Sequence, residues 1–188
     1  MEKEQLEKKV KDGIMECQNI ILIHPTAVMS EADFERLLCH CISKNIGENV
    51  ENVPKNNTFS VHTQISHYNK KNGKYSIGER VDILVLDESQ LQFCKDNRKD
   101  KYYGTSVALE LKYLHIGDSV SIVDKDFVKW ENLKTESSLF IVVLIEANSE
   151  RRFRIKRKIL LSTVANNYIE GRRSYHNKLY CYVLRKLV

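Results

Sequence analysis

Three residues in two apolar segments of the chain have side chains that could act together in chemistry. Asp82 is a lone acid within Arg80–Leu86 (RVDILVL), and Glu110 and Lys112 stand two residues apart within Ser106–Leu114 (SVALELKYL). Because side chains alternate across a strand, Glu110 and Lys112 share one face. Charged groups on apolar strands are costly to bury unless they have partners or a function. If the two strands pair near these residues, two carboxylates and one ammonium converge.

Such a group could bind a divalent cation and hydrolyse a phosphodiester. The carboxylates of Asp82 and Glu110, with the main-chain carbonyl of Leu111, are the hard oxygen ligands that Mg²⁺ (or Mn²⁺) prefers. Bound Mg²⁺ polarises a phosphate and lowers the pKa of a bound water, and Lys112 could orient that water or neutralise developing charge. The alternative is an edge strand with an ordinary Glu–Lys surface pair. Asp82 in a separate apolar strand favours the site.

The helices that would support these strands are predicted from apolar spacing. An N-terminal helix is expected to end before His24 and Pro25, with apolar residues at near-helical spacing at Leu6, Val10, Ile14 and Ile21. A second helix should begin at Ser30, which can cap its free amides, and end at Gly47. Its apolar stripe consists of Phe34, Leu37, Leu38, Cys41 and Ile42. Cys39 and Cys41, which flank His40, are therefore interpreted as core packing rather than as zinc ligands.

The strands are predicted from alternation and from short apolar runs. We expect strands at residues 58–68, 80–86, 106–114, 139–145 and 179–184, a turn at 69–74, and helices at 124–133 and 159–169. The order helix, three strands, helix, strand predicts an α/β (or α+β) fold with a central mixed sheet flanked by helices. The chain is expected to form a single domain over residues 1–188.

The motifs RVD at Arg80–Asp82 and ELKY at Glu110–Tyr113 resemble the signature of the PD-(D/E)XK nuclease superfamily. The resemblance implies a restriction-endonuclease-like core in the order α-β-β-β-α-β over about residues 30–145, with the family's aspartate, acidic residue and lysine at Asp82, Glu110 and Lys112. The segment DFVKW, residues 126–130, resembles the "D-x-x-K-L" helix of some members. Many members also carry a metal-binding glutamate in the helix before the sheet. Glu31 and Glu35 are the candidates, and Glu31 lies nearer the apolar stripe.

The resemblance implies a Mg²⁺-dependent endo- or exodeoxyribonuclease that acts on DNA. One alternative is a non-catalytic module that keeps the nuclease fold and binds nucleic acid or a protein partner. A third interpretation is a plain α/β interaction domain in which ELKY is coincidental. A homodimer, or a role as one subunit of a larger system, is also expected.

Charge and composition are consistent with a DNA partner. The 188 residues carry a formal net charge of +5, with 42% hydrophobic and 29% charged residues. One basic cluster could hold phosphates and comprises Arg151, Arg152, Arg154, Lys156, Arg157 and Lys158; the alternative is a solvated face.

The charged N-terminus does not resemble a signal peptide, the apolar runs are too short for a membrane span, and the odd cysteine count disfavours a disulfide framework. We therefore expect an intracellular protein, in the cytoplasm or, in a eukaryote, the nucleus.

Overall fold

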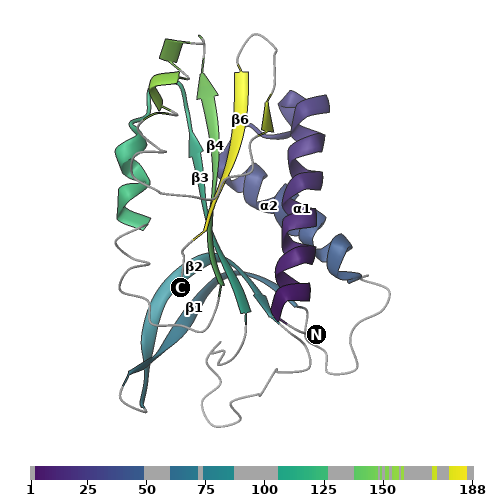
Figure 1. Ribbon diagram of the computed structural model, residues 1–188, viewed down its shortest axis with the longest axis vertical. Coiled ribbons are helices and arrows are strands. Elements are labelled where there is room, and N and C mark those ends of the chain that lie inside the picture. The colour runs from purple at the N-terminus through teal and green to yellow at the C-terminus, as the bar shows by residue number, and fades with distance from the viewer. Residues whose placement is uncertain are drawn as a thin grey trace.

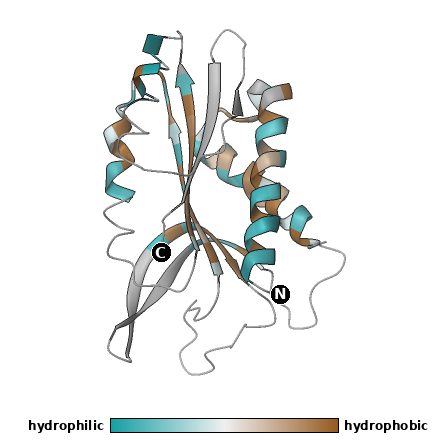
Figure 2. Ribbon diagram, viewed as in Figure 1, coloured by the Kyte–Doolittle hydropathy of each residue, from teal (hydrophilic) through white to brown (hydrophobic). Residues whose placement is uncertain are grey.

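The chain folds into a mixed α/β structure in which helices flank a mixed sheet (Figure 1). The computed structural model describes residues 3–48, 60–71, 74–86, 106–126, 138–147, 149, 151–152, 154–156, 158, 171–172 and 178–185. Hydrophobic residues run through the central strands, whereas helices α1 (Lys3–Ile23) and α2 (Glu31–Ile46) carry both hydrophobic and hydrophilic residues (Figure 2). This pattern is expected of helices that pack one side on a core.

Helix α1 packs closely against α2. Its buried hydrophobic residues follow the predicted helical spacing and are Leu6, Val10, Ile14, Cys17 and Ile21. The helix ends at Ile23, before His24, as predicted. Gly13 faces α2, and a Cβ atom at this position would lie 2.8 Å from the Cα atom of Ile42. The absence of a side chain at Gly13 therefore permits the close approach of the two helices.

The ends of α2 match the sequence-based prediction. Ser30 is the N-cap, and its hydroxyl accepts a hydrogen bond from the main-chain N–H of Asp33 at 3.1 Å. The Ser30 hydroxyl also donates to the Asp33 carboxylate at 3.0 Å. Gly47 ends the helix in the left-handed region, at φ 91°, which glycine adopts at low cost. Cys41 is fully buried in the core, as the apolar stripe predicted.

The described strands form one sheet in the order β1-β2-β3-β4-β6-β5. Their bounds are Val61–Lys71 for β1, Lys74–Leu86 for β2, Ser106–Leu114 for β3, Ser138–Ala147 for β4, Gly171–Arg172 for β5 and Lys178–Arg185 for β6. Strands β3 and β4 are parallel, and every other neighbouring pair is antiparallel. The parallel pair requires a crossover connection, which contains the 3-10 helix η3 (Val120–Ile122) and the helical residues 124–126.

Several boundaries differ from the predicted ones. The turn expected over residues 69–74 is shorter, because β1 and β2 stay paired as far as Lys71 and Lys74. Main-chain pairing does not require apolar side chains, so composition alone does not reveal how far the two strands stay paired. The short 3-10 helix η1 (Pro25–Ala27) and strand β5 were not predicted. Most of the helix predicted at 124–133, and all of the one at 159–169, lie outside the described residues.

Within the described part of the chain, no helix is both long enough and apolar enough to cross a membrane.

Candidate functional site

The predicted site lies where β2 and β3 separate. The ladder between these strands runs from Leu86↔Ser106 to Ile83↔Leu109, one position before Asp82 and Glu110 would face each other. Strand β2 nevertheless stays paired with β1, and β3 stays paired with β4 as far as Leu114. Beyond Leu109, the edge of β3 that faced β2 is therefore released from the ladder.

Two carboxylates bind the released edge of β3. Asp82 Oδ2 accepts a hydrogen bond from the main-chain N–H of Leu111 at 2.7 Å, and Glu31 Oε2 accepts one from the N–H of Tyr113 at 3.0 Å. The N–H and C=O of one strand residue point to the same edge. The Leu111 carbonyl therefore faces the side of β3 from which Asp82 approaches.

Strand alternation places Asp82, Glu110 and Lys112 on one face of the sheet. Leu84 pairs with Ala108, so their side chains share a face, and the residues two positions along each strand share it too. Glu110 is only 2% exposed, whereas Asp82 is half-buried. The two carboxylates and the ammonium therefore share one face of the sheet, and burial makes their charges costly without partners.

Lys112 is surrounded by acids. Its ammonium lies 3.5 Å from Asp126 Oδ2, and the two side chains are 19% and 12% exposed. Burial lowers the pKa of Lys112, but the charges of Asp126, Glu31, Asp82 and Glu110 outweigh burial and raise it above the ordinary value. Lys112 is therefore a cation at neutral pH, held by several carboxylates.

The two candidate helix glutamates make different contacts. Glu31 holds the edge of β3 by accepting a hydrogen bond from the Tyr113 N–H. Glu35 lies beside Asp82: the amide of Gln64 donates to Glu35 Oε2 at 3.4 Å and to Asp82 Oδ1 at 3.3 Å. Burial and the charges of Asp82 and Glu31 raise the pKa of Glu35, against the effect of the Gln64 hydrogen bond. Helical spacing favoured Glu31, yet Glu35 is the one linked to Asp82.

The oxygen atoms at this position are of the chemical type that binds a hard divalent cation. Carboxylate oxygens of Asp82 and Glu110, with the Leu111 carbonyl, are ligands of the type that Mg²⁺ and Mn²⁺ take, and such ions keep several waters. Among the residues that the structure describes, no three His, Cys, Asp or Glu side chains form a metal-binding group on their own. A cation at this position would therefore depend on the main-chain carbonyl and on water in addition to the carboxylates.

The basic cluster divides into exposed and buried members. Arg151, Arg152, Arg154 and Lys158 are exposed, and Arg157 lies outside the described residues. Lys156 is 8% exposed, and its ammonium donates to the main-chain carbonyl of His115 at 2.6 Å. Burial lowers the pKa of Lys156. Lys156 thus holds its segment against the end of β3, a contact that the sequence did not predict.

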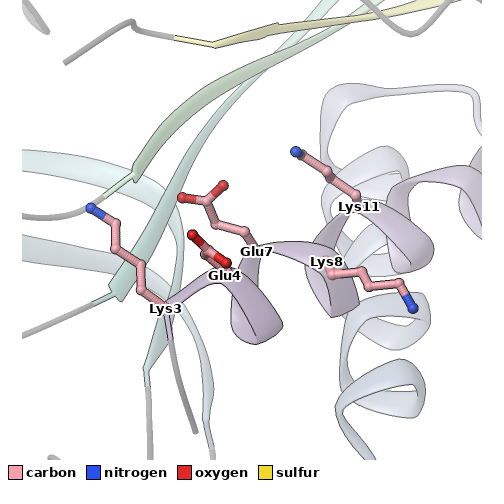
Figure 3. A pocket seen from close by; sticks show the side chains of 5 residues that line it. All are labelled: Lys3, Glu4, Glu7, Lys8 and Lys11. Atoms are coloured by element: carbon pink, nitrogen blue, oxygen red, sulfur yellow. The ribbon is translucent and has the colours of Figure 1, made fainter.

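A cavity of about 500 Å³ lies at the start of α1 (Figure 3). Its lining consists of Lys3, Glu4, Glu7, Lys8 and Lys11. The Glu7 carboxylate is buried and accepts a hydrogen bond from the Ser138 hydroxyl of β4. This hydrogen bond connects α1 to the sheet.

Sequence reasoning did not identify the roles of Gln64 and Asp126. The segment that contains Asp126 had a recognisable pattern, but its pairing with Lys112 depends on the crossover between β3 and β4. No sequence pattern marked Gln64 as a site residue, because a single glutamine on an alternating strand is ordinary. Its importance follows only from the register that sets it opposite Asp82.

Comparison with known proteins gives no family assignment: no protein-family model, no curated protein and no solved structure matches the chain.

Proposed function

We propose that the chain is a Mg²⁺-dependent nuclease that hydrolyses DNA phosphodiester bonds, with a restriction-endonuclease-like core of the PD-(D/E)XK type. The observation that carries the proposal is the grouping of Asp82, Glu110 and Lys112 at the point where β2 and β3 separate. Such a concentration of partly buried charge is costly for a purely structural strand pair and is common at catalytic sites.

Each residue has a role in this proposal. Asp82 and Glu110, with the Leu111 carbonyl, would hold the cation, and Glu35 is the helix carboxylate linked to Asp82 through Gln64. The bound cation would polarise the phosphate and lower the pKa of a water. Lys112, which remains protonated among its carboxylates, would orient the attacking water and offset charge that develops on the phosphate.

DNA is the proposed substrate because of the charge on the surface. Four exposed basic side chains gather within eight residues, at Arg151, Arg152, Arg154 and Lys158. Lysine and arginine clusters neutralise phosphates and release counterions, which strengthens binding to any DNA sequence. The buried Lys156 would serve this surface indirectly, by fixing the segment to His115.

The decisive experiment compares wild-type protein with Lys112→Ala and a matched control, Lys8→Ala, which removes an exposed lysine from α1. Linear, nicked, branched and single-stranded DNA are incubated with Mg²⁺ or Mn²⁺. We expect wild type and Lys8→Ala to cut at least one form, and Lys112→Ala to lose at least a hundredfold in rate while still binding DNA. Equal cutting by Lys112→Ala would place the catalytic site elsewhere.

A second function, a non-catalytic binding module, is favoured by one observation. Asp82 and Glu31 each accept a main-chain hydrogen bond from β3, so these carboxylates stabilise the separated strands even without a cation. If wild-type protein binds DNA but neither binds Mn²⁺ nor cuts any DNA form, this second function replaces the first.

A further inference from the structure

Gln64 of β1 stands directly opposite Asp82 in an unusual backbone conformation. The pairs Thr63↔Ile83 and Ile65↔Val81 flank it, yet Gln64 itself leaves the ladder. Its φ is 57°, in the left-handed region that residues with a side chain rarely adopt. The Arg80 guanidinium donates to its carbonyl at 2.9 Å and so holds the turned peptide in place.

The side chain of Gln64 joins two acids from different elements. Its NH₂ group has two donors, one directed to Glu35 of α2 and the other to Asp82 of β2, at 3.4 and 3.3 Å. Asp82 accepts this bond through Oδ1, whereas its Oδ2 accepts from Leu111. Both distances are longer than an optimal hydrogen bond, so the amide bridges the pair without binding either acid tightly.

This arrangement addresses a specific physical problem. Two carboxylates brought together without a cation repel each other, and the repulsion would separate α2 from the β1–β2 hairpin at the site. An amide between them supplies two positive N–H dipoles and no net charge. It can therefore hold the pair when no cation is present, without competing as a lysine or arginine would when a cation arrives.

Resting on the proposed function, we propose that Gln64 is a positioning residue that sets Glu35 and Asp82 for a divalent cation. Its strained backbone is part of this role, because the left-handed turn directs the amide towards both carboxylates. Residues held in rare conformations concentrate at functional sites when the surrounding structure fixes them, as Arg80 does here.

The test distinguishes the contribution of the Gln64 side-chain amide from that of its backbone conformation. Gln64→Gly removes the amide but adopts the left-handed conformation easily, Gln64→Ala removes the amide and strains the turn, and Gln64→Asn keeps a shorter amide on a residue that tolerates it. Thr63→Ala, an exposed neighbour on β1, is the control. Mn²⁺ affinity is measured by calorimetry, unfolding by urea, and cleavage as kcat and KM separately.

We expect Gln64→Gly and Gln64→Ala to bind Mn²⁺ about 10–100-fold more weakly than wild type, as loss of an outer-shell partner does elsewhere. The glycine variant should be the more stable of the two, and Gln64→Asn should recover part of the affinity. Cleavage should fall in kcat with little change in the KM for DNA, whereas Thr63→Ala should match wild type throughout.

The outcomes distinguish this proposal from the proposed function. Suppose that wild type binds Mn²⁺ and cuts DNA in a Lys112-dependent way while Gln64→Gly equals it in Mn²⁺ affinity and in cleavage. In that case Gln64 only shapes the strand, and its positioning role is overturned while the proposed function stands. If wild type binds no Mn²⁺, the cation site and the role of Gln64 fail together.

Discussion

The Lys112 ammonium and the Asp126 carboxylate lie 3.5 Å apart, and they join β3 to the middle of the crossover that leads to β4. Both side chains are largely shielded from solvent. Asp126 is therefore well placed to hold the lysine that we propose acts on substrate. The contact also connects the candidate site to the part of the chain that makes the parallel β3–β4 pair possible.

We expect Asp126→Asn to destabilise the fold by roughly 1–3 kcal/mol, because it leaves a partly buried ammonium without its nearest counter-charge. In a Lys112→Met background the same change should cost less, which gives a coupling of about 0.5–3 kcal/mol in a double-mutant cycle. A lysine with a raised folded-state pKa contributes stability below its unfolded pKa and loses it as pH rises through the folded value. Urea unfolding at pH 7 should therefore show the full coupling energy between Lys112 and Asp126. If the two substitutions had additive effects on the free energy of unfolding, the two side chains would not form a stabilising ion pair.

Gly13→Ala should lower stability, although alanine normally favours a helix over glycine by about 0.5–1 kcal/mol. The added Cβ would lie 2.8 Å from the Ile42 main chain, so the helices must move apart, at a cost of about 1–3 kcal/mol for overpacking. Gly117→Ala is the control, since nothing lies within 4 Å of a Cβ there. Thermal unfolding of both variants measures the difference; equal midpoints would show that α1 and α2 do not approach so closely.

Local sequence patterns predicted the elements better than their relations in space. Ser30 and Gly47 marked the ends of α2 because capping depends on a few adjacent residues. The alternation of Glu110 and Lys112 along β3 likewise followed from geometry within one strand. The separation of β2 from β3 and the role of Gln64 opposite Asp82 depend on register between distant segments, which single residues do not encode.

The basic cluster should behave as two functional groups rather than one. Reversing charge at Arg151 and Arg154 should weaken DNA binding and reduce the slope of log affinity against log salt by about 0.9 for each duplex phosphate that the variant no longer neutralises. Lys156→Met should instead reduce stability, because its buried ammonium binds the His115 carbonyl. Fluorescence anisotropy across a salt series, with urea unfolding of each variant, separates the two. An unchanged slope in the Arg151/Arg154 variant would mean that these arginines form an ordinary solvated face.

Cys39 should react slowly with alkylating reagents at neutral pH. Burial, helped by the charge of Glu35, raises the pKa of the Cys39 thiol to about 12. At pH 8 its alkylation should be about a thousandfold slower than that of a free cysteine, and the rate should still rise with pH up to pH 10. Mass spectrometry of the Cys39 peptide after iodoacetamide treatment gives the rate, with urea-unfolded protein as the control. If the alkylation rate stopped rising near pH 9, the thiol would be neither buried nor close to a charged Glu35.

The sharpest test of the cation site uses two substitutions of Asp82. Asp82→Asn keeps an oxygen that can accept the Leu111 hydrogen bond but removes the charge, whereas Asp82→Ala removes both. If Asp82 binds a cation, both variants should lose Mn²⁺ affinity by at least tenfold and lose cleavage with it. Only the alanine variant should also lose stability, by roughly 1–3 kcal/mol, because the Leu111 N–H is left without its acceptor. Calorimetry with Mn²⁺, urea unfolding and DNA cleavage are measured on the same preparations. An asparagine variant that matches wild type in all three would mean that Asp82 serves only to hold the edge of β3, and the proposed nuclease mechanism would have to be abandoned.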